Sequence, residues 1–250
     1  TKKIYKDFID KDERLLVISR ESSELTKYAS NSFLATKISF MNQLSQFCSL
    51  VGADIEEVRL GMGPDPAIGE RYLYAGCGFG GSCLPKDINS LIHQSQEKGK
   101  ELTILKAVRE VNDSQKEYLF SLALNLFNED LSNKVIAIWG LSFKPETDDM
   151  RGAPSLTIIE KLLGRGAKVK AYDPVVSKKS TNFELIHENF SLLLSAEEVV
   201  SGSDCLIICT EWDEFKKPDY KNLYKTMRRK LILDGRNMLI PEDVKKEGFE

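Results

Sequence analysis

The sequence predicts an α/β protein in which a helical part is followed by a Rossmann-like, doubly wound parallel sheet. Two observations carry this prediction. Up to about residue 130, apolar residues recur at helical spacing, most clearly between Glu24 and Leu50. From Lys134 onward, short apolar runs alternate with helical segments, as in strands joined by crossover helices. We therefore expect a helical domain over 1–130 and a sheet domain over 131–250.

The helical part begins with an unusually long helix over residues 24–50. Ser22 or Ser23 can cap its start, and Gly52 can end it. Two faces of this helix are apolar, one with Leu34, Ile38, Met41, Ser45 and Cys48, the other with Phe33, Phe40, Leu44, Phe47 and Val51. Two apolar faces need two coverings, so we expect a homodimer formed through this helix. The alternative is a central core helix in a monomer.

Three further helices are predicted before residue 130. Asp54 with Glu57 three residues later forms a capping box for a helix over 55–60. A helix over 85–97 is ended by Gly99, and a longer helix covers about 102–128. The inward positions of the longer helix are expected to be Leu105, Val108, Leu119, Leu122 and Leu126.

The sheet part contains four predicted buried strands, over 135–139, 169–172, 206–209 and 231–233, with a helix over 155–163 after the first. Gly140 ends the first strand, where such sheets usually hold nucleotide phosphates. No predicted strand is followed by GxGxxG, so the dinucleotide-binding fingerprint is absent. Asp173 could mimic a ribose-binding acid, but we favour a turn residue. A Rossmann-like domain without a ligand is the alternative for this half.

The composition excludes several classes of protein. Hydrophobic residues make up 42% of the chain, charged residues 29%, and the net charge is −3. These values argue against disorder and against a basic surface for nucleic acid or membrane. No apolar run approaches the roughly 20 residues of a membrane span, so a cytoplasmic protein is expected. Five Cys, two distant His and no CxxC pair predict neither a disulfide framework nor a metal site.

Cys83 is the candidate nucleophile. Glycines at 78, 80 and 81 precede it, and Pro85 marks the first turn of the next helix. A thiol at a helix start meets the positive end of the helix dipole, and Lys86 adds a cation, so the nucleophilic thiolate is favoured. The other four cysteines are expected to be inert, because Cys48, Cys205 and Cys209 lie in apolar segments and Cys77 lacks the helix start.

Three polar residues are candidates to act beside this thiol. Lys27 and Asn31 share one face of the long helix, four residues apart. On a helix that is largely buried, such a pair needs a polar partner, and a substrate oxygen would serve. Asp87 lies one turn beyond Cys83 and could orient a water molecule or a lysine.

Together, the segments ELTKYASNSFLATKISFMNQL, GCGFGGSCLPKD and GLSFKPETDDMRGAPS, followed by YDP and DGRN, resemble the UDP-glucose/GDP-mannose dehydrogenase family over essentially the whole chain. The resemblance implies two oxidations of a nucleotide-sugar primary alcohol by NAD, giving a carboxylate. Cys83 would capture the aldehyde as a thiohemiacetal, which becomes a thioester. Lys27 and Asn31 would stabilise the reacting oxygen, and Asp87 would assist proton transfer.

The resemblance also implies binding residues. Lys86 and Arg151 would reach NAD, most of which would be bound by an N-terminal domain absent from these 250 residues. Substrate would be bound by Tyr72, Leu73, Tyr74, Ala75, Gly76, Phe79, Gly80, Phe143, Lys144 and Arg236.

Two positions depart from the family pattern. Ala67 stands where the family often has an arginine that reaches into the neighbouring subunit, and Leu84 replaces a common phenylalanine. The segment 61–83 looks most like the UDP-glucose branch. Dehydrogenases of GDP-mannose or UDP-N-acetylhexosamine are the alternatives, as is a non-catalytic nucleotide-sugar-binding dimerisation module.

Overall fold

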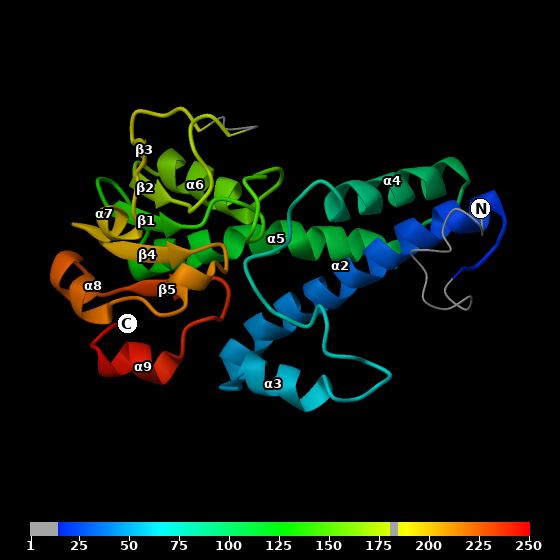
Figure 1. Cartoon of the computed structure of the whole chain (residues 1–250), viewed down its shortest axis with the longest axis horizontal. Coiled ribbons are helices and arrows are strands. Elements are labelled where there is room, and N and C mark those ends of the chain that lie inside the picture. The colour runs from blue at the N-terminus through cyan, green and yellow to red at the C-terminus, as the bar shows by residue number, and fades with distance from the viewer. Residues whose placement is uncertain (1–14, 181–184) are drawn as a thin grey trace.

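The computed structural model describes residues 15–180 and 185–250. Figure 1 shows a helical part and a sheet part, with helix α5 (Thr103–Leu126) running from one into the other. Helix α5 packs against α2 (Arg20–Val51) and α4 (Leu84–Glu97) on one side, and against α6 (Pro154–Gly164) of the sheet part on the other. The predicted order of a helical part followed by a parallel α/β sheet is confirmed.

Helix α2 starts earlier than predicted. Ser19 caps it by accepting a hydrogen bond from the backbone N–H of Ser22 at 3.1 Å, so the cap assigned to Ser22 or Ser23 is wrong. The predicted end is confirmed, because Gly52 takes a left-handed conformation with φ of 75°. Such a conformation is disfavoured for residues that carry a Cβ.

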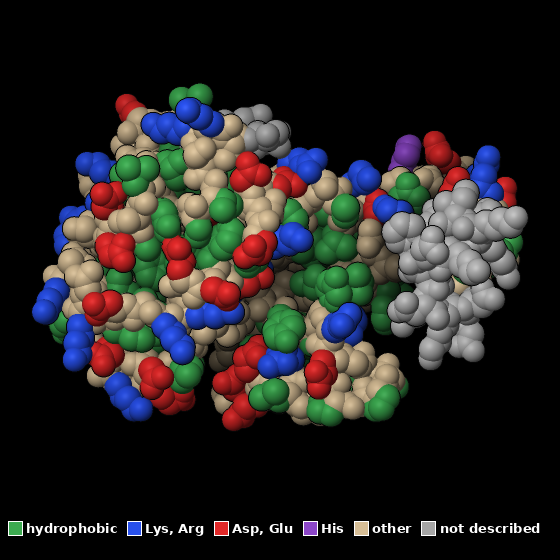
Figure 2. Space-filling model, viewed as in Figure 1, with side chains coloured by type: hydrophobic (Ala, Val, Ile, Leu, Met, Phe, Trp, Pro, Cys, Tyr) green, Lys and Arg blue, Asp and Glu red, His purple; other side chains and the backbone are tan. Residues whose placement is uncertain are grey.

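The two apolar faces of α2 have different surroundings. Met41 and Cys48 of the first face are buried against Ile55, Leu73 and Ala75. The second face leaves Phe33, Phe40, Phe47 and Val51 exposed, at 64%, 53%, 56% and 59% respectively. In Figure 2, hydrophobic side chains gather over the middle of α2, between the two parts of the molecule. The second face is therefore an uncovered aromatic stripe along a helix of 32 residues.

The shorter helices follow the predictions with shifted ends. Helix α3 (Ile55–Met62) runs past residue 60, and Asp54 caps it through the N–H of Glu56 without the predicted box. Helix α5 buries Val108 and Leu119, but Leu126 is 39% exposed, so its inward placement is wrong. In the last turn, Ala123 and Leu124 face the core instead.

The sheet has the strand order β3-β2-β1-β4-β5, and all its strand pairs are parallel. Its strands are β1 (Val135–Trp139), β2 (Lys168–Tyr172), β3 (Phe190–Leu192), β4 (Cys205–Ile208) and β5 (Ile232–Asp234). Strand β3 is absent from the predictions because it has only three residues, none of them buried. The other strands lie within one residue of the predicted ranges.

Helices cover both faces of the sheet, as a doubly wound fold requires. Helices α5 and α6 pack on the face that presents Ile136, Ile138 and Val169. The opposite face, with Ala137 and Trp139, packs against α7 (Ala196–Val200), α8 (Tyr220–Thr226), α9 (Pro241–Lys246) and the 3-10 turn Asp213–Phe215. Within the described ranges, no helix is long and apolar enough to cross a membrane.

The strand order places a ligand-binding edge between β1 and β4. From β1 the chain moves outward to β2 and β3, then returns to add β4 and β5 on the other side. Ligands in such sheets bind where this direction reverses, beyond the carboxyl ends of the strands. The loops that begin at Gly140 and Cys209 leave the sheet at this point.

Candidate active site

A cleft of about 680 Å³ lies between the helical part and this edge of the sheet. Helix α2, the glycine-rich loop and the segments after β1 and β4 all contribute to its walls. Of the residues predicted to act on a substrate, the cleft is lined by Asn31, Tyr72, Tyr74, Phe79, Gly80, Cys83, Phe143, Lys144 and Arg236. Residues that are more than 100 positions apart in the sequence therefore share one cleft.

Five predicted substrate or catalytic residues do not line the cleft in this structure, and one of them is Lys27, whose ammonium is bound to Asp87. Leu73 and Ala75 are 2% and 3% exposed and alternate with the exposed Tyr72 and Tyr74, so they hold that segment in place. Gly76 lines a second cavity on the far side of the chain. Asp87 is fully buried and reaches the cleft only through its hydrogen-bond partners.

Cys83 occupies the predicted position at the start of α4. It is the N-cap residue, with Pro85 in the first helical turn, and its side chain is exposed. The thiol lies 3.8 Å from the hydroxyl of Ser82. Lys27 and Arg151 are close enough for the sulfur's charge to raise the pKa of each of them, after the larger effects of Asp87 on Lys27 and Asp149 on Arg151. A thiolate at Cys83 would therefore face positive charge.

Asp87 connects the two candidate catalytic residues of α2. One of its carboxylate oxygens accepts hydrogen bonds from Lys27 Nζ at 2.6 Å and from Asn31 Nδ2 at 2.5 Å. Lys86 Nζ lies 3.6 Å from the other oxygen, which has no hydrogen-bond partner among the described residues. The structure thus assembles a Lys27–Asn31–Asp87 cluster, with Cys83 one helical turn before the carboxylate.

The charges of this cluster stabilise each other. Burial raises the pKa of the Asp87 carboxyl. The hydrogen bonds from Lys27 and Asn31 together with the charge of Lys27 lower it by more than burial raises it, so the pKa lies below its usual value. The hydrogen bond to Asp87 raises the pKa of Lys27. Both groups are therefore charged at neutral pH, with an ammonium and an amide next to the thiol. Such donors can stabilise an oxyanion.

The glycine-rich loop is held by close backbone packing. A Cβ at Gly80 would lie 2.4 Å from the carbonyl oxygen of Gly152, so only glycine fits. The N–H of Gly81 donates to the carbonyl of Arg151 at 2.7 Å. The loop that carries Cys83 is therefore fixed to the loop between β1 and α6.

Two amide side chains of α5, which the sequence analysis did not single out, hold the same loop from the other side. Asn112 accepts from the N–H of Phe79 at 2.8 Å and donates to its carbonyl at 3.1 Å. Gln115 Nε2 donates to the carbonyl of Gly76 at 2.7 Å. Both lie on the buried face of α5 among apolar residues. A buried amide needs a hydrogen-bond partner, so this placement in the sequence could have indicated their role.

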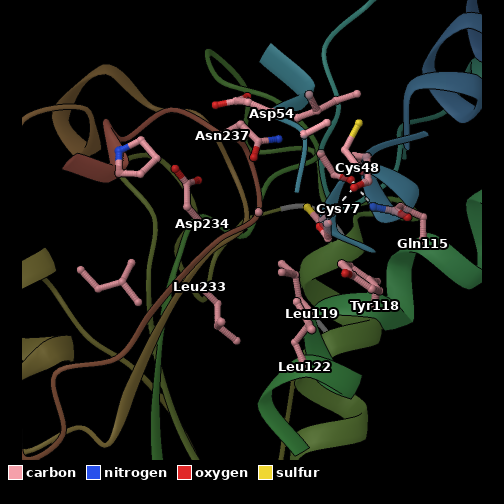
Figure 3. A pocket seen from close by; sticks show the side chains of 18 of the residues that line it. Cys48, Asp54, Cys77, Gln115, Tyr118, Leu119, Leu122, Leu233, Asp234 and Asn237 are labelled. Atoms are coloured by element: carbon pink, nitrogen blue, oxygen red, sulfur yellow. Dashed lines mark hydrogen bonds between the residues drawn. The ribbon is translucent and has the colours of Figure 1, made fainter. Parts of the chain in front are cut away.

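The second cavity, of about 520 Å³, lies behind this loop (Figure 3). Figure 3 shows Cys77 and Gln115 at one end, with Asp54, Asp234 and Asn237 at the other. Asn237 Nδ2 donates to the carbonyl of Ala75 at 3.1 Å, which ties the segment after β5 to the same stretch of chain. The cavity contains none of the four predicted catalytic residues.

Cys77 differs from the inert thiol expected from the sequence. Hydrogen bonding with Cys209, opposed by burial and aided by the charge of Arg236, lowers the pKa of Cys77 to about 7. Its side chain is only 1% exposed, so dissolved reagents cannot reach it. That Cys77 is a structural residue remains a prediction. Its basis is now that the thiol is buried, and no longer that nearby groups fail to lower its pKa.

Two cations of the cleft lie at the edge of the sheet. Arg236 Nε donates to the carbonyl of Cys209 at 2.7 Å and lies 3.0 Å from a carboxylate oxygen of Glu211. Lys144 is exposed beside Phe143, with its ammonium 5.7 Å from the ring centre. No carboxylate of the described ranges pairs with Lys144, so its charge is available to a ligand.

Asp173 is a turn residue that also organises this edge. Its carboxylate accepts from the N–H groups of Val175 and Val176, both at 3.1 Å. The other oxygen accepts from the N–H groups of Leu141 and Ser142 at 2.8 and 3.0 Å. With all these bonds and 4% exposure, Asp173 shapes the loop after β1 instead of presenting an acid to a ribose.

The predicted NAD contacts lie outside the cleft. Lys86 and Arg151 are 68% and 56% exposed, and Arg151 is bound to Asp149. They offer cations for a pyrophosphate near Cys83.

The glycine-rich segment contains the letters of GxGxxG at Gly76, Gly78 and Gly81, but a loop precedes it instead of a strand. It therefore lacks the structural setting of a dinucleotide loop. The described residues fit NAD only in part.

Comparison with known proteins agrees with this geometry. The chain combines a helical part, with a cysteine at a helix start, and a parallel sheet whose ligand-binding edge lines the same cleft. Residues 21–114 match the UDP-glucose/GDP-mannose dehydrogenase family, central domain, and residues 137–241 match its UDP binding domain. The chain therefore belongs to the UDP-glucose/GDP-mannose dehydrogenase family.

No group of three or more metal-ligating side chains occurs in the described part of the chain.

The relatives are longer than this chain. A UDP-glucose 6-dehydrogenase of Pseudomonas aeruginosa is 43% identical over 99% of this chain and 55% of its own length. One from Bacillus subtilis is 42% identical over 92% of this chain and 51% of its own length. A solved UDP-glucose dehydrogenase of Pyrobaculum islandicum superposes with a TM-score of 0.85 at 33% identity, covering 95% of this chain and 52% of that one. The chain thus spans about half the length of its relatives.

Proposed function

We propose that this chain is the substrate-binding and thiol-bearing part of a UDP-glucose 6-dehydrogenase. The whole enzyme would oxidise UDP-glucose to UDP-glucuronate with two molecules of NAD, which accept the two hydrides. The observation that carries the proposal is the exposed Cys83 in a cleft beside the Lys27–Asn31–Asp87 cluster. A non-catalytic binding module would have no use for this arrangement.

The first oxidation converts the primary alcohol of the sugar to an aldehyde. As the hydroxyl passes its proton to solvent water, negative charge develops on its oxygen, and the Lys27 ammonium and Asn31 amide stabilise that charge. Asp87 keeps Lys27 charged and orients both donors. The carboxylate is therefore a positioning group at this stage.

The second oxidation proceeds through Cys83. Its thiolate adds to the aldehyde carbon and forms a thiohemiacetal, whose oxygen meets the same two donors. Loss of the second hydride leaves a thioester, and water then attacks its carbonyl carbon and releases the acid and the thiol. The proton of that water can pass to Asp87 through its hydrogen-bond partner Lys27.

The rest of the cleft would hold the nucleotide sugar. Lys144 would bind the diphosphate and Phe143 would form the adjoining wall, while Arg236 would reach the sugar. Tyr72 and Tyr74 would follow the sugar along the opposite side. Lys86 and Arg151 would contact NAD from outside the cleft.

Other nucleotide sugars are the second candidates. A solved UDP-D-ManNAc dehydrogenase of Pyrococcus horikoshii superposes with a TM-score of 0.80 at 27% identity, over 96% of this chain and 53% of that one. The two curated UDP-glucose enzymes reach 43% and 42% identity, which favours UDP-glucose. Turnover of each nucleotide sugar by the complete enzyme separates these candidates.

We expect the 250-residue chain to bind UDP and UDP-glucose but to have negligible affinity for NAD. The cleft with Lys144 and Arg236 belongs to this chain, whereas Lys86 and Arg151 are only part of an NAD site. Isothermal titration calorimetry with each ligand measures the difference. Micromolar binding of NAD together with no binding of UDP would contradict the proposal.

We also expect a homodimer formed through the aromatic stripe of α2. Phe40 and Phe47 are 53% and 56% exposed, and a second copy would remove this apolar surface from water. Replacing both with Asp should lower the mass measured by light scattering to that of the monomer. The matched control is Gln94→Asp at an exposed position of α4, outside the stripe, which should leave the mass unchanged. A wild-type chain that is already monomeric at tens of micromolar would sink the prediction.

A further inference from the structure

Arg71 lies in the wall of the substrate cleft and has no role in the function proposed above. It is exposed, and within residues 15–180 and 185–250 no carboxylate lies within ion-pair distance of it. The neighbouring acid, Glu70, packs instead against Gly63 and acts electrostatically on Arg59. Arg71 therefore presents an uncompensated positive charge.

The segment before Arg71 is anchored to α2. Lys37 Nζ donates to the carbonyls of Ile68 and Gly69 at 3.0 and 3.2 Å. Tyr72 has a φ of 65°, an uncommon conformation for a residue with a Cβ, and it lines the same cleft as Arg71. An anchored loop followed by a strained residue places Arg71 at the cleft instead of leaving it on a free surface loop.

The charged side chains of the cleft leave an excess of positive charge. Among the residues that the structure describes, its wall contains the cations Arg71, Lys144 and Arg236 and one carboxylate, Glu211. Glu211 lies 3.0 Å from Arg236 and neutralises it. Lys144 and Arg71 remain, and the diphosphate diester of a nucleotide sugar carries two negative charges. Two free cations thus match two anionic phosphates.

We propose that Arg71 is an affinity-determining residue that binds the diphosphate of the nucleotide sugar together with Lys144. This inference rests on the proposed function, because it assumes that a nucleoside diphosphate occupies the cleft. Arg71 would supply, from within the same chain, a positive charge near the loop in which Ala67 stands. Phosphate recognition would then be shared between the helical part and the sheet part.

Calorimetric titration of the chain with UDP, UMP and uridine tests the inference. Arg71→Ala should weaken UDP binding by about tenfold or more, the usual loss of a charged hydrogen bond, and leave uridine binding unchanged. Arg71→Lys should recover a large part of the loss. Arg165→Ala is the matched control, since Arg165 is exposed at the end of α6, near the amino ends of β1 and β2, and should leave all three affinities unchanged.

The outcomes separate the two proposals. If UDP binds the wild type and Arg71→Ala stays within about twofold of it, below the loss expected for a charged hydrogen bond, Arg71 does not hold the diphosphate and the proposed function stands. An equal loss for uridine and UDP would also overturn the inference, because the effect would then not depend on phosphate. If the wild type binds neither UDP nor UDP-glucose, the proposed function fails and the role of Arg71 fails with it.

Discussion

Replacing Cys83 with Ser should reduce the formation of UDP-glucuronate by at least about 10³-fold, a loss typical of removing a covalent nucleophile. Serine keeps the shape of the site, but its hydroxyl stays protonated where the thiol can ionise. It also provides no thioester for water to open. The measurement needs the complete enzyme with its NAD-binding part, which we propose lies outside these 250 residues. NADH release and the acid product are followed together.

Cys77→Ser is the matched control for this variant. It makes the same exchange of sulfur for oxygen in the same loop, but at a side chain with 1% exposure outside the cleft. It should retain most of the turnover. If Cys83→Ser kept turnover near that of the wild type, the covalent mechanism would be wrong for this protein.

The chain alone supports a companion measurement. With limiting iodoacetamide at neutral pH, Cys83 should be alkylated first, because it is exposed and the other four thiols are buried. Bound UDP-glucose should slow the labelling by covering the cleft. Peptide mapping by mass spectrometry identifies the labelled residue, and faster labelling of Cys77 or Cys48 would contradict the expectation.

Asp87→Asn should lower kcat of the complete enzyme by about 10²- to 10⁴-fold, the usual contribution of a positioned acid–base group. The amide keeps the size of the carboxylate but cannot take a proton, and it leaves the Lys27 ammonium without its counter-charge. Affinity for UDP should be nearly unchanged, because the proposed diphosphate cations lie elsewhere in the cleft. Steady-state kinetics and calorimetry measure the two quantities separately.

Glu97→Gln on the same helix is the control for Asp87→Asn. Glu97 is exposed, and its ion-pair partner among the described residues is His93 at 3.5 Å, so this change should leave kcat unaltered. Thermal unfolding of both variants shows whether the fold is kept. A kcat for Asp87→Asn that matches the control would remove Asp87 from the mechanism.

The pKa of Asp87 also sets a pH dependence for folding. Because the folded structure holds this pKa below the usual value of 3.8, the carboxylate stabilises the fold fully above that pH. Its contribution is lost as the pH falls through the lower pKa of the folded state. The difference in the free energy of unfolding between the wild type and Asp87→Asn should therefore stay constant at neutral pH and above. It should shrink in acid, as the pH falls through the pKa of Asp87 in the folded state.

Residues whose signal is local could be predicted from the sequence. Val135–Trp139 is a bounded apolar run and was predicted to the residue. Cys83 stands between glycines and a proline, so its helix start could be predicted without any distant contact. Strand β3 escaped prediction because its pairing with β2 is tertiary and its own residues form too short a run.

The polar side chains that hold the site together could not be predicted from local sequence. Asn112 meets Phe79 from 33 positions away, and Lys27 meets Asp87 from 60. No sequence pattern states such a pairing, because it exists only after α2, α4 and α5 have packed. The sequence placed Lys27 and Asp87 each beside the thiol and allowed Asp87 to orient a lysine, but it did not identify Lys27 as that lysine. Asn112 and Gln115 had no such guide.

The glycine-rich loop is attached to α5 through Asn112 and to the loop after β1 through Gly80 and Gly81. Because Cys83 follows that loop and Phe143 and Lys144 belong to the other, the proposed nucleophile and the proposed phosphate contacts share one frame. Their separation is therefore set before any substrate arrives. Under the proposed function, the cleft would therefore fix the distance between the diphosphate and the sulfur of Cys83. A sugar whose oxidisable carbon lies at a different distance from its diphosphate would bind through its nucleotide and would not be oxidised.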